Sequence, residues 1–163
     1  MTTAPRVDSD DQLVRLLQIG VVLEEMVEAR AYEHYRRLPE EERDETIETL
    51  LESVSSQSKE HRERLESLID DLGAPTVAFE AIEDLVADQY ARTRPEDFDG
   101  VLYDQMNGEA TAYKFYDDLI EAIRETEREF GVDRERVIDT LEGIREEEAR
   151  GVERVANLME ERA

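Results

Sequence analysis

An eleven-residue helical phrase occurs twice in this chain, and the repeat restricts the folds that the chain can adopt. "EARAYEHYRRL" at residues 28–38 returns 81 positions later as "EATAYKFYDDL" at residues 109–119, with six of the eleven residues identical. Both copies carry apolar residues at the three- and four-residue spacing of an amphipathic helix. A weaker match joins residues 57–69 to residues 147–159. The chain is therefore predicted to consist of two copies of one helical hairpin.

Apolar periodicity and local stop signals predict four long helices. Pro39 ends the first helix, Asp44 is an N-cap for the second, and Gly73 follows the second helix as its stop. Gly131 ends the third helix in the same way, and Asp133 caps the fourth. The expected helices cover about residues 10–38, 45–72, 97–130 and 134–162.

The connections between these helices predict how they are arranged. The first and third connections are short, so each helix pair forms an antiparallel hairpin. Residues 74–96 join the second helix to the third, contain a short amphipathic helix, and are long enough to run the length of the pairs. We therefore expect an all-α fold, an antiparallel four-helix bundle with one long crossover. It forms a single domain over residues 10–163, with helix pairs at 10–72 and 97–162 and a flexible N-terminus at 1–9.

The composition excludes several classes of protein. The 163-residue chain is 39% hydrophobic, too apolar for a disordered acidic tail, and has no apolar run long enough to span a membrane. A net charge of −24 argues against nucleic-acid binding. The absence of cysteine excludes disulfides and thiolate metal sites and fits a cytoplasmic location. High acid content with scarce lysine predicts a salt-adapted, halophilic protein.

Polar residues interrupt the apolar stripe of each expected helix, at Glu28, His61, Glu109 and Glu148. Glu24 lies one turn before Glu28 and is a second candidate on the first helix. A buried carboxylate is costly unless it is paired or bound to a cation, and converging carboxylates repel one another unless protons or a metal ion neutralise them. Carboxylates together with an imidazole suit iron or manganese, so these residues are candidate metal ligands.

The repeated phrase resembles that of the rubrerythrin-related branch of the ferritin-like di-metal proteins. The form typical of this family, E-x-x-A-x-x-(F/Y)-Y-x-x-L, begins at a glutamate that serves it as a ligand. The resemblance implies a ferritin-like bundle in which the first and third helices each supply one glutamate, which here are Glu28 and Glu109. It also implies a Glu-x-x-His ligand pair on each of the other two helices.

The second and fourth helices depart from that pattern. "SKEH" at residues 58–61 keeps the histidine and has serine in place of the glutamate, whereas "EARG" at residues 148–151 keeps the glutamate and has glycine in place of the histidine. Four of the six ligand positions remain, so we expect one ion rather than a full di-metal centre. The expected ligands are Glu28, His61, Glu109 and Glu148, with water completing the shell. Glu24, Glu60 or Glu147 could also swing in as ligands, and Glu24, Tyr35 and Tyr116 are expected as accessory residues.

The position of the first turn decides whether Glu28 and His61 lie at the same level along the bundle axis. They lie at the same level, in one layer, if the turn centres near residue 44. If the second helix begins directly after Pro39, His61 lies two to three turns from Glu28. A loop over residues 39–44 nearly reconciles the two arrangements.

The resemblance implies iron- or manganese-dependent handling of oxygen, peroxide or iron. As an enzyme, the protein would be a rubrerythrin-like oxidoreductase that needs an external electron donor, because it has no cysteines for a rubredoxin-type module. The alternative is a metal-free ferritin-like scaffold that serves as a structural or protein-interaction module. A homodimer is expected in either case, since helical bundles often pair through their remaining apolar surface.

Overall fold

All of the regular secondary structure that the computed structural model describes is helical. The described residues are 7–37, 39–87 and 98–162. Within them, the backbone alone is described at residues 30–32, 34, 35, 42, 85–87, 98–105, 107, 159 and 162. The prediction of an all-α protein is therefore confirmed over the described part of the chain.

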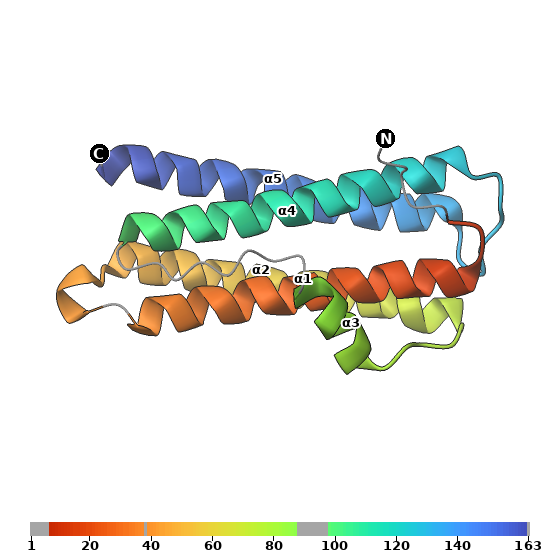
Figure 1. Ribbon diagram of the computed structural model, residues 1–163. Coiled ribbons are helices and arrows are strands. Elements are labelled where there is room, and N and C mark those ends of the chain that lie inside the picture. The colour runs from red at the N-terminus through yellow and green to blue at the C-terminus, as the bar shows by residue number, and fades with distance from the viewer. Residues whose placement is uncertain (1–6, 38, 88–97, 163) are drawn as a thin grey trace, which may run out of the picture.

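Four long helices form two antiparallel hairpins that lie against each other (Figure 1). The long helices are α1 (Asp10–Arg37), α2 (Glu45–Leu72), α4 (Phe98–Glu125) and α5 (Arg134–Arg162). Helix α1 packs against α2 and, across the hairpins, against α4, whereas the contact between α2 and α5 is the sparsest of these. None of the described helices is long and apolar enough to cross a membrane.

Helix α2 ends and α4 begins at opposite ends of the long helices (Figure 1), so the connection between the hairpins joins opposite ends of the molecule. It contains α3 (Phe79–Ala87), which confirms the short helix expected within residues 74–96, and α3 packs on α1. The Gln18 side chain fixes the start of this segment, because its amide donates to the Val77 carbonyl at 3.0 Å and accepts from the Val77 N–H at 3.1 Å. Residues 88–97 of the crossover lie outside the described residues.

Local signals place most helix ends where the sequence predicts them. The Asp44 carboxylate accepts a hydrogen bond from the Thr46 N–H at 2.7 Å and caps α2. Gly73 ends α2 in the left-handed region, with φ of 63°. The Asp133 carboxylate accepts from the Glu135 N–H at 3.2 Å at the start of α5. A short 3-10 turn, η1 (Glu40–Glu42), separates α1 from α2.

Helix α4 ends earlier than expected, at Glu125 instead of Phe130. The Thr126 hydroxyl accepts a hydrogen bond from the Arg128 N–H at 3.3 Å, which turns the chain out of the helix. Gly131 lies in the loop that follows, where its N–H donates to the Asp10 carboxylate at 3.1 Å. The loop thus ties the α4–α5 turn to the beginning of α1.

One apolar core fills the half of the molecule nearest the α4–α5 turn. Its largest fully buried side chains include Leu13, Leu17, Leu65, Leu119 and Leu141. Val7 is also buried in this core, with 1% of its surface exposed, so the packed part of the chain begins before Asp10. Residues 1–6 of the expected flexible N-terminus lie outside the described residues. The polar side chains that break the stripes lie beyond this core, further along the helices.

Candidate metal centre

Three helices bring one carboxylate, one imidazole and a second carboxylate together in the interior. The residues are Glu24 on α1, His61 on α2 and Glu148 on α5, and one potential ligand atom from each lies within 4.8 Å of the other two. All three are buried, with 2%, 0% and 4% of their surfaces exposed. We call these three residues the buried triad.

His61 is the centre of the triad. Its Nδ1 lies 3.1 Å from Oε1 of Glu24 and 3.2 Å from Oε1 of Glu148, while its Nε2 faces the carboxylate of Glu147 on the other side of the ring. The Tyr116 hydroxyl, on α4, donates a hydrogen bond to Oε1 of Glu24 at 2.8 Å. All four long helices therefore contribute to this polar layer.

The protons in the triad are distributed unevenly. Burial opposes a charge on His61, but its hydrogen bonds to Glu148 and Glu24 outweigh burial and raise its pKa from 6.5 to about 10. Burial, followed by the negative charge of Glu24, raises the pKa of Glu148 from 4.5 to about 9. Burial also acts on Glu24, but hydrogen bonds from His61 and Glu148 overcome it and lower the pKa of Glu24. Without a metal, two protons thus compensate the converging acids.

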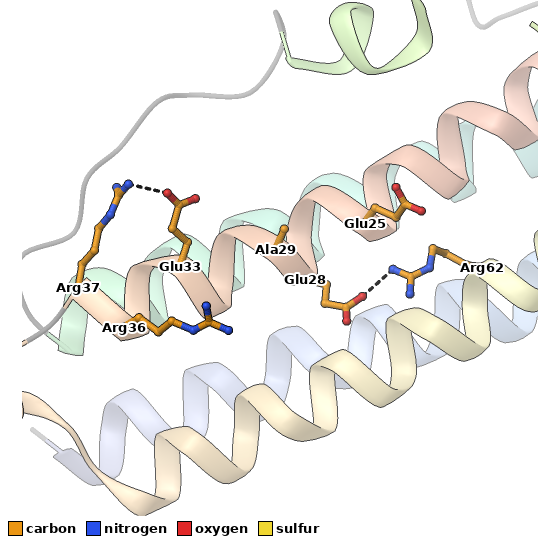
Figure 2. Close-up of a pocket in the computed structure, with 7 residues that line it drawn as sticks. All are labelled: Glu25, Glu28, Ala29, Glu33, Arg36, Arg37 and Arg62. Atoms are coloured by element: carbon orange, nitrogen blue, oxygen red, sulfur yellow. Dashed lines mark hydrogen bonds and ion pairs between the residues drawn. The ribbon is translucent and has the colours of Figure 1, made fainter. Parts of the chain in front are cut away.

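The structure does not bring the expected ligand Glu28 into this group. Its carboxylate accepts hydrogen bonds from the Arg62 guanidinium and the Ser55 hydroxyl, each at 2.6 Å, at the edge of an open groove (Figure 2). The reason is the position of the first turn. Because α1 ends at Arg37 and α2 begins at Glu45, Glu24 lies opposite His61, one turn before Glu28.

Glu109, the ligand expected from the second copy of the phrase, is buried but is not one of the three triad residues. Its carboxylate packs against the backbone of Gly151, one turn beyond Glu148 on α5. Ser58, at the position where the family pattern has a glutamate, is also buried. Of the four ligands expected from the sequence, His61 and Glu148 are thus brought together, while Glu28 and Glu109 lie beside other partners.

The accessory residues also differ in their placement. Tyr116 contacts Glu24, as a hydrogen-bond donor to a carboxylate. The side chain of Tyr35 lies outside the described residues. Glu60 pairs with Arg64 on its own helix and is exposed.

Glu147 lies in direct contact with His61, although its place in the sequence does not indicate this. It belongs to the acidic run "REEEAR" at residues 145–150, which resembles a solvated helix face. Its carboxylate nevertheless contacts Nε2 of His61 and lies 3.4 Å from the guanidinium of Arg64. The sequence gives only a weak signal for this contact, the position of Glu147 next to Glu148. The signal is weak because adjacent residues of a helix point in different directions.

The triad fits a single metal ion by its donor chemistry. One imidazole nitrogen and two carboxylates are ligands that suit iron, manganese or zinc. Glu147, on the far ring nitrogen, fixes the orientation of the imidazole as outer carboxylates do for metal-binding histidines. Ser58 and Gly151 supply neither the second bridging carboxylate nor the second imidazole, so the described residues do not fit a symmetric two-metal centre.

No family model, curated protein or solved structure matches this chain.

Proposed function

We propose that this protein binds one divalent transition-metal ion, of the iron or manganese class, inside a ferritin-like four-helix bundle. The observation that carries the proposal is the convergence of Glu24, His61 and Glu148 from three helices, all buried. Buried acids without a cation are destabilising, and an ion would replace the two protons that compensate them in the metal-free protein.

The residues around the triad support this role. Glu147 orients the imidazole so that Nδ1 faces the two carboxylates, and Tyr116 holds one oxygen of Glu24. A bound iron or manganese ion would supply a redox-active centre for oxygen, peroxide or iron chemistry. The chain's own residues would bind the ion, hold its ligands in place and exclude bulk water from it.

A second candidate function is a metal-free scaffold, and one observation favours it. His61 already contacts three carboxylates, those of Glu24, Glu147 and Glu148, so the polar layer is internally hydrogen-bonded without an ion. Such a network can fix the register of packed helices. In that case the bundle would serve as a structural or interaction module, and its stability would not respond to metal.

Metal content separates the two functions. Protein purified in molar KCl is stripped with chelator, reconstituted anaerobically with Fe²⁺, Mn²⁺ or Zn²⁺, desalted and analysed for metal. We expect about one ion per chain in the wild type, and loss of binding by at least tenfold in Glu24→Gln, which removes one charged ligand. Glu28→Gln is the matched control on the same helix and should bind as the wild type does.

Two results would contradict the metal site. Wild-type protein that retains no ion would favour the scaffold. Loss of metal in Glu28→Gln but not in Glu24→Gln would place the ion nearer the ligand set expected from the repeat.

A further inference from the structure

The buried triad needs a route to solvent if ions are to reach it. Its three members are at most 4% exposed. On the α1–α4 side, Tyr116 is fully buried and covers Glu24. On the α1–α2 side, an ion pair joins Glu28 to Arg62, one turn along α1 from Glu24 and next to His61 on α2.

The α2–α5 side is different, because a partly exposed acid there touches the triad directly. The side chain of Glu147 is 23% exposed, and its Oε2 contacts His61. It lines a surface cavity of about 480 Å³, together with Gln57 from α2 and Arg150 from α5. Glu147 is therefore in contact with both the buried imidazole and the solvent.

The surroundings of Glu147 allow this contact to open. Helices α2 and α5 share the sparsest contact among the long-helix neighbours, so a local separation here disrupts less backbone packing than at the other seams. Oε1 of Glu147 lies 3.4 Å from Arg64, and Arg64 also pairs with the exposed Glu60. Arg64 thus has a second acid to pair with when a cation takes its place on Glu147.

A larger groove, of about 630 Å³, lies on the α1–α2 side, but it is a weaker candidate (Figure 2). Its acids include Glu28, which is held by Arg62, and Glu33, which is held by Arg37. None of the groove's residues belongs to the triad, and Glu28 and Glu33 contact arginines, whereas Glu147 in the α2–α5 cavity contacts the imidazole of His61.

We propose that a metal ion enters and leaves the triad through the α2–α5 seam, and that Glu147 binds it in transit. This inference rests on the proposed metal site. Glu147 releases Arg64, binds the incoming cation at the surface, and passes it to the carboxylates of Glu24 and Glu148 beside the same imidazole. This role in transit makes Glu147 a determinant of the rate of metal exchange more than of the metal affinity.

The absence of cysteine from the chain makes a direct test available. Arg150→Cys places one thiol in the α2–α5 cavity, and Glu33→Cys places one in the α1–α2 groove as the matched control. Each is labelled with a bulky maleimide, and Co²⁺ binding is followed by stopped-flow absorbance, against the unlabelled form of the same variant. We expect the label at 150 to slow association and dissociation by at least tenfold with little change in Kd, and the label at 33 to change neither rate.

Three outcomes would overturn the proposal. Unchanged rates with the label at 150 would exclude the seam as the route, and slowing by the label at 33 would assign the route to the groove. Failure of every variant and of the wild type to bind Co²⁺ would remove the metal site itself, and the route with it.

Substitution of Glu147 and Arg64 provides an independent test. If Glu147 carries ions in transit, Glu147→Gln should lower the association rate, whereas a purely orienting role would leave that rate unchanged and raise the dissociation rate alone. Arg64→Gln should accelerate uptake several-fold, because it removes the cation that competes for Glu147. An increase confined to dissociation in Glu147→Gln, or slower uptake in Arg64→Gln, would contradict the proposal.

Discussion

The carboxylate of Glu109 occupies the space that a side chain at Gly151 would need. A Cβ atom at position 151 would lie 2.0 Å from Oε2 and 2.8 Å from Oε1 of Glu109. By the sequence repeat, position 151 corresponds to His61, so the second hairpin has an acid from α4 where the first has an imidazole. A histidine at 151 would therefore require Glu109 to move, and the imidazole of the buried triad comes from α2.

This contact predicts that Gly151→Ala destabilises the protein. Alanine favours a helix by about 1 kcal/mol over glycine, but the methyl group would displace a buried carboxylate, and overpacking of this kind costs about 1–3 kcal/mol. We expect a net loss in the free energy of unfolding, measured by urea denaturation in molar KCl.

Gly143→Ala on the same helix is the control for that prediction. Its Cβ would meet only Arg64 Nη1, at 3.6 Å, an ordinary contact. It should raise the free energy of unfolding by about 0.5–1 kcal/mol through helix propensity. Equal stabilisation by both substitutions would show that Glu109 yields its position freely.

The parts of the fold that follow from local signals could be predicted from the sequence. Asp44 and Gly73 end α2 through interactions within a few residues of themselves, and the stripe positions of His61 and Glu148 follow from helical periodicity.

The sequence misplaces the end of α4 because Gly131 is its more prominent stop signal, whereas the helix ends at Glu125, just before the hydrogen bond from the Arg128 N–H to the Thr126 hydroxyl. Gly131 instead lies in the following loop, where it is tied to Asp10, 121 residues away in the chain.

The α1 member of the buried triad could not be predicted from the sequence either. The repeat favours Glu28, since it matches Glu109. The α1 residue that lies opposite His61 depends on the number of residues in the turn between α1 and α2. Here that turn contains η1, which follows Pro39. A shift of one helical turn exchanges Glu28 for Glu24, and nothing in the helix periodicity distinguishes them.

The uneven protonation of the triad predicts that the metal-free protein loses stability as the pH rises. The pKa of His61 is raised from 6.5 to about 10 and that of Glu148 from 4.5 to about 9, so the folded state keeps protons that the unfolded chain releases. Each contribution is complete below the unfolded value and is lost as the pH rises through the folded value. Between pH 7 and 9, the free energy of unfolding should fall by up to about 1.4 kcal/mol per pH unit for each such proton.

Metal should reverse this trend. An ion competes with the same protons, so the stabilisation by added Mn²⁺ should grow between pH 7 and 9. Glu24 has the opposite pH dependence: because its pKa is lowered, its contribution to stability is lost only as the pH falls into the acid range. Tyr116 contacts Glu24, Glu147 contacts His61, and Arg64 pairs with Glu147. Glu148→Gln leaves these three in place and should flatten the pH dependence. A metal-free stability that is constant or rises over this range would contradict the assigned protonation.

The surface charge predicts stabilisation by salt. A net charge of −24 on 163 residues repels itself in dilute buffer, and concentrated salt screens that repulsion. The melting temperature of the chelated protein should therefore rise between about 0.1 M and about 2 M KCl. Sucrose at matched osmolality controls for general exclusion from the surface. A melting temperature that stays flat in KCl, or rises no more than in sucrose, would argue against salt adaptation.

Two sets of substitutions separate a stabilising role of the triad from a binding role. His61→Leu leaves Glu24 and Glu148 facing each other without a countercharge, and removal of one member of a buried charged group costs about 3–5 kcal/mol. Replacement of the whole layer by Glu24→Leu, His61→Leu, Glu148→Leu and Tyr116→Phe removes the charges together with the hydroxyl that donates to Glu24. We expect this fourfold variant to be at least as stable as the metal-free wild type, because apolar groups often replace buried ion pairs without loss.

The comparison is made by urea denaturation in the presence of chelator, with metal content measured in parallel. A fourfold variant that is more stable than the metal-free wild type but binds no metal would mean that the polar layer lowers the stability of the metal-free bundle. Retention of such a layer would then favour a role in binding an ion. If the fourfold variant is as unstable as His61→Leu, the hydrogen-bonded triad itself holds the helices in register. The metal-free scaffold would then be the better description of the protein.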